Sequence, residues 1–240
     1  MNPSVQDTLV DSANLLLKIN RDDTWLDQLS DDLRQKGFSI IDHALPEIDA
    51  ITLKNHLLSL RQAQVLRAAA IGRGENINQD SDIRRDNIHW LSPSIAETVG
   101  VIERPQHADD LWINAMESLR STLNQRLFLG LFSYESHYAW YAPGAFYKTH
   151  MDAFRGESNR VLSTVFYLND DWQPEDEGHL MIYDNAEQPL AKVAPEFNRL
   201  VVFLSEEFPH EVLPATRDRL SIAGWFRLNA NIGQRLDPPA

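Results

Sequence analysis

The chain has 240 residues and contains no cysteine. This absence excludes disulfides and thiolate metal sites, so any metal ion must be held by histidine and carboxylate side chains. Long apolar runs are also missing, because the run at 200–204 is far too short to span a bilayer. The first residues carry no cationic stretch ahead of an apolar one, so we expect no signal peptide. These absences predict a soluble, cytoplasmic protein.

Positive charge is scarce. Lysine and arginine number 22 against 35 aspartates and glutamates, which gives a formal net charge of −13. This excess of negative charge argues against a nucleic acid or an anionic membrane as partner, and its simplest explanation is solubility. Hydrophobic residues make up 43% of the chain, which is enough for the core of one globular domain.

Helical periodicity is confined to the first half of the chain. Apolar residues recur at helical spacing from Trp25, and Gly37 follows as a stop signal before an expected strand at 38–41. A second helix is expected at 46–60, with proline in its first turn. A third is expected at 109–128, with its apolar residues on one face.

The second half reads as short strands separated by proline, glycine, asparagine and aspartate. Eight strands after a helical prefix predict a mainly β fold with a helical buttress, a double-stranded β-helix or jelly roll. We expect one domain at 24–230, with helical support at 24–130 and a core at 133–228, between an extension at 1–23 and a frayed tail at 231–240. The expected strands lie at about 133–142, 146–152, 160–169, 179–184, 190–194, 199–204, 209–215 and 219–228.

A polar stretch interrupts the helical half at 72–82. Strand-like segments flank it at 66–71 and 88–91. Such a loop is either a solvated hairpin or a mobile lid over a site, and the sequence leaves both open.

His150, Asp152 and His210 form a candidate metal site. Residues i and i+2 of a strand share a face, so His150 and Asp152 can hold one ion, and His210 would complete the site from a facing strand. Two histidines and one carboxylate bind non-haem Fe(II) and leave positions open for substrate and oxygen. A lone His-x-Asp pair is more often merely exposed. The pair at His107 and Asp109 precedes a helix, where Asp109 reads better as a capping or first-turn acid.

Arg219 opens a strand of strict alternation. It shares one face with Ser221, Ala223 and Trp225, and the two small residues leave room for a ligand. A buried guanidinium needs an anionic partner, either a carboxylate ligand held bidentately or a local acidic side chain in an internal salt bridge. Tyr167 could add a hydroxyl donor, or be an ordinary core aromatic. A metal ion beside a carboxylate clamp is what an Fe(II)- and 2-oxoglutarate-dependent oxygenase requires.

Several segments resemble the prolyl hydroxylases. Residues 141–152, which read Tyr-Ala-Pro-Gly-Ala-Phe-Tyr-Lys-Thr-His-Met-Asp, resemble the iron-ligand segment of that family. The likeness extends over roughly residues 30–228 and is strongest to the oxygen-sensing prolyl hydroxylases of the hypoxia response and their bacterial counterparts. It continues in order through residues 71–74, 83–90, 167–172, 209–215 and 219–226.

The resemblance implies a role for each candidate site residue. His150, Asp152 and His210 bind Fe(II) and are catalytic, Arg219 holds the distal carboxylate of 2-oxoglutarate, and Tyr167 assists Arg219. O2 is the second cosubstrate.

Further residues are implied around the pocket. Tyr141 resembles a pocket tyrosine near the cofactor. The segment 73–86 resembles one that folds over a bound peptide, which makes Arg73, Arg84 and Asp86 the expected substrate-binding residues.

The implied reaction hydroxylates a prolyl residue in an exposed loop of a protein substrate and releases succinate and CO2. A translation elongation factor is one candidate substrate, and oxygen sensing is one candidate role. One alternative is the same chemistry on a free amino acid or small metabolite. Another is a non-catalytic jelly roll that senses a metal or ligand, which would not require the triad together with Arg219 and Tyr167.

Overall fold

The computed structural model describes most of the chain. The expected extension at 1–23 and residues 72–79 of the polar loop lie outside the described residues, as does Arg73. Within the expected tail, the backbone of β12 (Asn231–Ile232) pairs with that of β13 (Arg235–Leu236). The described ranges are 24–69, 80–93, 107–153 and 159–229, with the backbone of these two short strands.

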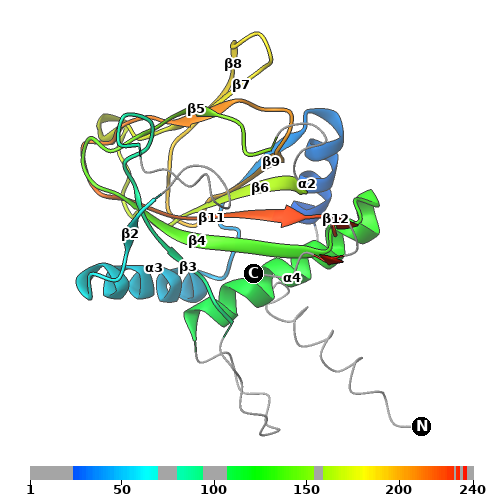
Figure 1. The fold of residues 1–240 in the computed structure, drawn as a ribbon, viewed down its shortest axis with the longest axis horizontal. Coiled ribbons are helices and arrows are strands. Elements are labelled where there is room, and N and C mark those ends of the chain that lie inside the picture. Colours follow the sequence, from blue (N-terminus) through cyan, green and yellow to red (C-terminus); the bar gives the residue numbers. More distant parts are fainter. Residues whose placement is uncertain are drawn as a thin grey trace, which may run out of the picture.

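Two antiparallel sheets face one another and form the jelly roll (Figure 1). The larger sheet has seven strands in the order β1-β9-β6-β11-β4-β3-β2, and the smaller has four in the order β5-β10-β7-β8. The larger sheet comprises β1 (Phe38–Ile41), β2 (Arg67–Ala68), β3 (Asn87–Trp90), β4 (Ser133–Tyr141), β6 (Arg160–Tyr167), β9 (Leu200–Leu204) and β11 (Arg219–Arg227). The smaller comprises β5 (Tyr147–His150), β7 (Leu180–Tyr183), β8 (Pro189–Val193) and β10 (His210–Val212).

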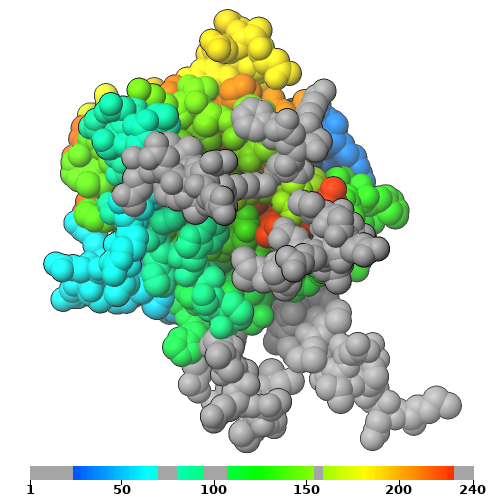
Figure 2. All heavy atoms as spheres, in the orientation of Figure 1, coloured from blue at the N-terminus to red at the C-terminus, as the bar shows by residue number. Residues whose placement is uncertain are grey.

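The eight expected strands are confirmed as β4 to β11, each within a few residues of its predicted ends. The β7–β8 hairpin projects from the body of the molecule (yellow in Figure 2). Strands β2 and β3 also pair antiparallel, as the flanks of a hairpin do. Whether the polar loop between them acts as a hairpin or a lid stays a prediction, because most of it lies outside the described residues.

In the part of the chain that the structure describes, three helices cover the outer face of the larger sheet, and all three were expected. They are α2 (Thr24–Gln35), α3 (Glu47–Gln62) and α4 (Ala108–Leu127). Figure 1 shows α3 and α4 along that face, opposite the smaller sheet. Gly37 ends the turn after α2 at a φ of 77°, and its N–H bonds to the carbonyl of Asp32. Among the described residues, no helix combines the length and the apolar character needed to cross a bilayer.

The alternation of β11 divides the core into two layers, as its sequence predicted. Leu220, Ile222 and Phe226 pack with the helices in one apolar cluster. Arg219 and Ser221 are buried on the opposite face, toward the interior between the two sheets. A second apolar cluster fills that interior, with Tyr141, Tyr167 and Phe203 from the larger sheet and Leu180, Ile182 and Val212 from the smaller.

Gly224 of β11 lies where no side chain fits. A Cβ there would stand 2.2 Å from the hydroxyl oxygen of Tyr134 and 2.7 Å from the carbonyl oxygen of Glu135. We predict that Gly224→Ala lowers the free energy of unfolding by about 3 kcal/mol, the upper range for overpacking, as measured by urea denaturation.

The control is Gly144→Ala. A Cβ at Gly144 would meet no atom within 4 Å, so this variant carries only the cost of its positive φ, about 1 kcal/mol. A loss at Gly224 no larger than that at Gly144 would contradict the steric explanation.

Candidate active site

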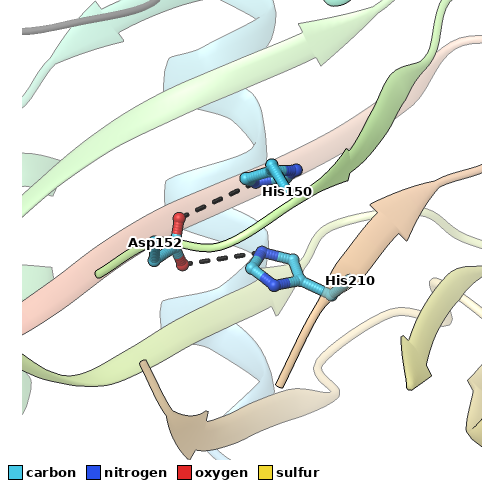
Figure 3. A group of neighbouring side chains, drawn as sticks. All are labelled: His150, Asp152 and His210. Atoms are coloured by element: carbon cyan, nitrogen blue, oxygen red, sulfur yellow. Dashed lines mark ion pairs between the residues drawn. The ribbon is translucent and has the colours of Figure 1, made fainter. Parts of the chain in front are cut away.

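Strand pairing brings the three candidate metal ligands together. His150 is the last residue of β5 and His210 the first of β10, and the two face each other across the antiparallel ladder. Asp152 follows β5 by two residues. The Nε2 atoms of His150 and His210 lie 3.7 and 3.5 Å from the Asp152 carboxylate oxygens (Figure 3). One ligand atom from each residue lies within 4.8 Å of the others, which is close enough to hold a metal ion.

The peptide backbone orients both imidazole rings. The Nδ1 of His150 lies 2.8 Å from the carbonyl oxygen of Lys148, and the Nδ1 of His210 lies 3.0 Å from that of Phe208. A carbonyl oxygen only accepts, so each Nδ1 carries the proton and donates it. In a neutral imidazole the lone pair is then on Nε2, and both Nε2 atoms lie on the side of Asp152, the arrangement that histidine ligands of metals usually show.

The ionisation states of this group also suit a metal site. Burial and the neighbouring His210 lower the pKa of His150 to about 3, so its imidazole is neutral at physiological pH. Burial by itself would raise the pKa of Asp152, but His210, His150 and a hydrogen bond from Ser163 outweigh it and hold that pKa at about 2. Neutral imidazole and ionised carboxylate are the forms that bind metals.

Ser163 orients the Asp152 carboxylate, and Ser205 in turn bonds to Ser163. The Ser163 hydroxyl of β6 donates to Oδ2 of Asp152 over 2.6 Å. The Ser205 hydroxyl lies 2.9 Å from that of Ser163. These two hydrogen bonds fix the orientation of the Asp152 carboxylate, which lies beyond the end of β5.

Arg219 and Tyr167 offer unsatisfied donors in the same interior. Arg219 is 1% exposed, and its Nε donates to the carbonyl of Gly178 over 2.9 Å, while its Nη2 has no hydrogen-bond partner within the described residues. The buried hydroxyl of Tyr167 is also without a partner there. None of the described acidic side chains forms an ion pair with Arg219, so the internal salt bridge expected as the alternative is not found among them. Buried polar groups are rarely left unpaired, so the two donors fit an anionic ligand such as a carboxylate.

Register explains why these donors meet. Arg219 stands opposite Tyr141 of β4, and Ser221 stands opposite Tyr167 of β6. The guanidinium carbon lies 5.1 Å from the ring centre of Tyr141 and 5.0 Å from that of Tyr167. Burial raises the pKa of both tyrosines above the usual value, although the Arg219 charge opposes the shift. Both hydroxyls therefore stay protonated and able to donate.

The structure places Arg84 and Asp86 against each other. Arg84 donates from Nε and Nη2 to the two oxygens of Asp86 over 2.6 and 2.7 Å, and Asp86 is 2% exposed. Their expected contact with a substrate stays a prediction. Asp109 lies apart from the triad in the first turn of α4, as expected, with its carboxylate 3.5 Å from His56.

Sequence reasoning missed Ser163, Ser205, Gly178 and Tyr147, which support the candidate site residues. Ser163 could have been found, because it shares the inward face of β6 with Tyr167. The Gly178 carbonyl leaves no trace in a side-chain pattern. Tyr147 stands within the segment that resembles the prolyl hydroxylases but carried no expected role.

Comparison with known proteins agrees with this geometry. The model of the 2OG-Fe(II) oxygenase superfamily matches residues 136–227, which span the candidate metal ligands and Arg219. Human Egl nine homolog 1 is 30% identical over an alignment of 162 residues, which covers 64% of this chain. The chain spans only 36% of the length of that relative.

Two solved structures share the fold over most of the chain. A prolyl hydroxylase from Trichoplax adhaerens, in complex with a peptide fragment of the hypoxia inducible factor oxygen degradation domain, is 26% identical with a TM-score of 0.70. The alignment covers 95% of this chain and 94% of that one. A prolyl-4-hydroxylase from Pseudomonas putida is 40% identical with a TM-score of 0.72, over 84% of this chain and 98% of that one. On the strength of this near-complete match, the chain belongs to the prolyl hydroxylase family of the 2OG-Fe(II) oxygenases.

Proposed function

We propose that this protein is an Fe(II)- and 2-oxoglutarate-dependent dioxygenase that hydroxylates a prolyl residue in a protein substrate. The observation that carries the proposal is the pairing of two complementary groups in one interior. His150, Asp152 and His210 present metal-ligand atoms from the smaller sheet and the segment after it. Arg219 and Tyr167 present unpartnered donors from the larger sheet.

Each residue has a definite task in this proposal. The triad would hold Fe(II), which with 2-oxoglutarate and O2 supplies the oxidising chemistry. Arg219 and the Tyr167 hydroxyl would bind the distal carboxylate of 2-oxoglutarate, and Tyr141 would donate to the same cosubstrate. The aromatic and aliphatic side chains of the interior would keep water from these groups once they are bound.

A protein substrate is supported by the peptide complex of the relative from Trichoplax adhaerens. We propose a translation elongation factor as the first candidate to test. The experiment incubates the candidate factor with wild-type enzyme or His210→Ala and searches by mass spectrometry for one added oxygen on proline. Oxidation of free proline, with no modified protein, would support the small-molecule alternative instead.

The triad assignment predicts a sharp division between two kinds of variant. His150→Ala, Asp152→Ala and His210→Ala should each abolish Fe(II)-dependent conversion of 2-oxoglutarate to succinate, because each removes a metal ligand. Asp109→Ala removes one of the two acids in the first turn of α4, and this variant should retain that activity. Full succinate formation by His210→Ala would remove that residue from the triad.

The carboxylate clamp predicts a defect specific to the cosubstrate. Arg219→Ala should weaken 2-oxoglutarate binding on the order of ten- to several-hundred-fold while metal binding persists, because charge-assisted hydrogen bonds are lost. Arg219→Lys should recover part of the affinity, since an ammonium replaces the charge but not the fork. Titration of 2-oxoglutarate into the metal-loaded protein measures the effect.

Arg199→Ala is the matched control. Arg199 also makes charged contacts, with Asp42 and Glu196, but these partners are exposed. Its loss should leave 2-oxoglutarate affinity unchanged. Unchanged affinity in Arg219→Ala would instead assign Arg219 a purely structural role.

A further inference from the structure

The segment that contains Arg84 is bonded to the strand that ends in His150. The N–H of Arg85 donates to the carbonyl of Phe146 over 3.0 Å, and that of Lys148 donates to the carbonyl of Ile83 over 2.9 Å. Between these two bonds, Arg84 and Tyr147 form an antiparallel bridge. The segment thus lies along the edge of the smaller sheet, directly beside the candidate metal ligand.

An irregularity in β5 turns Tyr147 toward His150. On a regular strand, residues three apart point to opposite faces. Here His150 stands opposite His210 and Tyr147 opposite Val212, so four residues of β5 span the same length as three of β10. This bulge reorients the strand, as bulges near active sites often do. The Tyr147 ring consequently stacks on the His150 imidazole, with 3.5 Å between ring centres and 12° between planes.

Arg84 also lies against the Tyr147 ring. Its guanidinium carbon lies 4.5 Å from the ring centre, so this ring contacts both the guanidinium and the stacked His150 imidazole. Burial disfavours the charged form of Arg84, but the two hydrogen bonds that Arg84 donates to the Asp86 carboxylate, and the charge of that carboxylate, outweigh burial and raise the pKa of Arg84 above its usual value. Arg84 therefore stays charged, and its guanidinium cation attracts the Tyr147 ring.

The Arg84–Asp86 pair is also held together inside the protein. Both carboxylate oxygens of Asp86 accept from Arg84, and its side chain is fully buried. Removing one member of such a pair would leave a buried charge without compensation. The pair therefore stays together, and it keeps the Arg84 guanidinium against the Tyr147 ring.

We propose that Tyr147 is a positioning residue that holds the plane of the His150 imidazole, and that the Arg84–Asp86 pair acts on the metal site through Tyr147. This inference rests on the metal site of the proposed function. The hydrogen bond to the Lys148 carbonyl fixes the Nδ1 edge of the His150 imidazole. The stacked Tyr147 ring prevents the imidazole from rotating about this hydrogen bond. The position of the 83–86 segment would then affect the affinity of the triad for metal. Because such coupling is reciprocal, a bound metal would also restrain this segment.

The test measures metal binding, without turnover. Mn(II) is titrated into the purified full chain, and the visible charge-transfer band of the anaerobic Fe(II)–2-oxoglutarate complex reports the ligand geometry. Tyr147→Leu should weaken Mn(II) affinity by about 10- to 100-fold, as loss of groups that orient metal ligands does, and should shift the band. Tyr147→Phe keeps the ring and should remain close to wild type in both measurements.

Phe146→Leu is the matched control. Phe146 precedes Tyr147, and its ring lies 4.8 Å from the Arg85 guanidinium carbon, so the same kind of contact is removed one residue away from the stack. This variant should bind Mn(II) like wild type. Wild-type affinity in folded Tyr147→Leu, or an equal loss in Phe146→Leu, would overturn the proposal.

A double variant tests the supporting pair and covers the case in which Tyr147→Leu does not fold. Arg84→Gln with Asp86→Asn removes both charges together, so neither is left buried alone. It should weaken Mn(II) affinity and shift the charge-transfer band, although no metal ligand has changed. Unchanged affinity and band position in the folded double variant would show that the pair does not act on the metal site. Failure of the wild-type chain to bind Mn(II) would refute the proposed metal site itself, a distinct result.

Discussion

Antiparallel pairing between β5 and β10 sets His150 opposite His210, and only in this register can Asp152 reach both imidazoles. A shift of one residue would turn one histidine to the other face of the smaller sheet. The features around the triad preserve this arrangement. Backbone carbonyls fix both rings, Ser163 fixes the carboxylate, and the bulge in β5 places an aromatic ring against His150.

The larger sheet contributes Arg219 and Tyr167 to the site, and their burial imposes a different constraint. A guanidinium and a phenol hydroxyl are buried there without full pairing, which costs folding free energy in the free protein. Burial of apolar side chains in the two clusters offsets this loss of folding free energy, since β11 packs against the helices on its other face. An anionic cosubstrate would satisfy the same donors, so ligand binding should also stabilise the fold.

Much of this architecture could be predicted from the sequence, because periodicity reports which face of an element is buried. The inward face of β11 followed from alternation, the eight core strands followed from the turn residues that separate them, and the three helices followed from apolar spacing. The triad followed from residue type, although Asp152 lies just past the strand in which alternation placed it.

The missing parts depend on interactions that side-chain patterns do not encode. The bulge in β5 is a property of register with β10, so alternation alone would place Tyr147 and His150 on opposite faces. The mutual pairing of Arg84 with Asp86 depends on the fold of their segment. The Gly178 carbonyl that receives Arg219 belongs to the backbone of a distant turn.

If Arg219 binds the distal carboxylate as proposed, that carbonyl limits which acids the site can accept. Because Arg219 is tethered through Nε to Gly178, its free edge cannot swing to follow a ligand of different length. Gly178 is equally constrained, since its φ is 64° and a Cβ there would stand 2.7 Å from that of Ala215. In the proposed site, the fixed position of the guanidinium relative to the triad would therefore select dicarboxylates by their length. A dicarboxylate one methylene shorter or longer than the separation allows must leave either the arginine or the metal ligands poorly engaged.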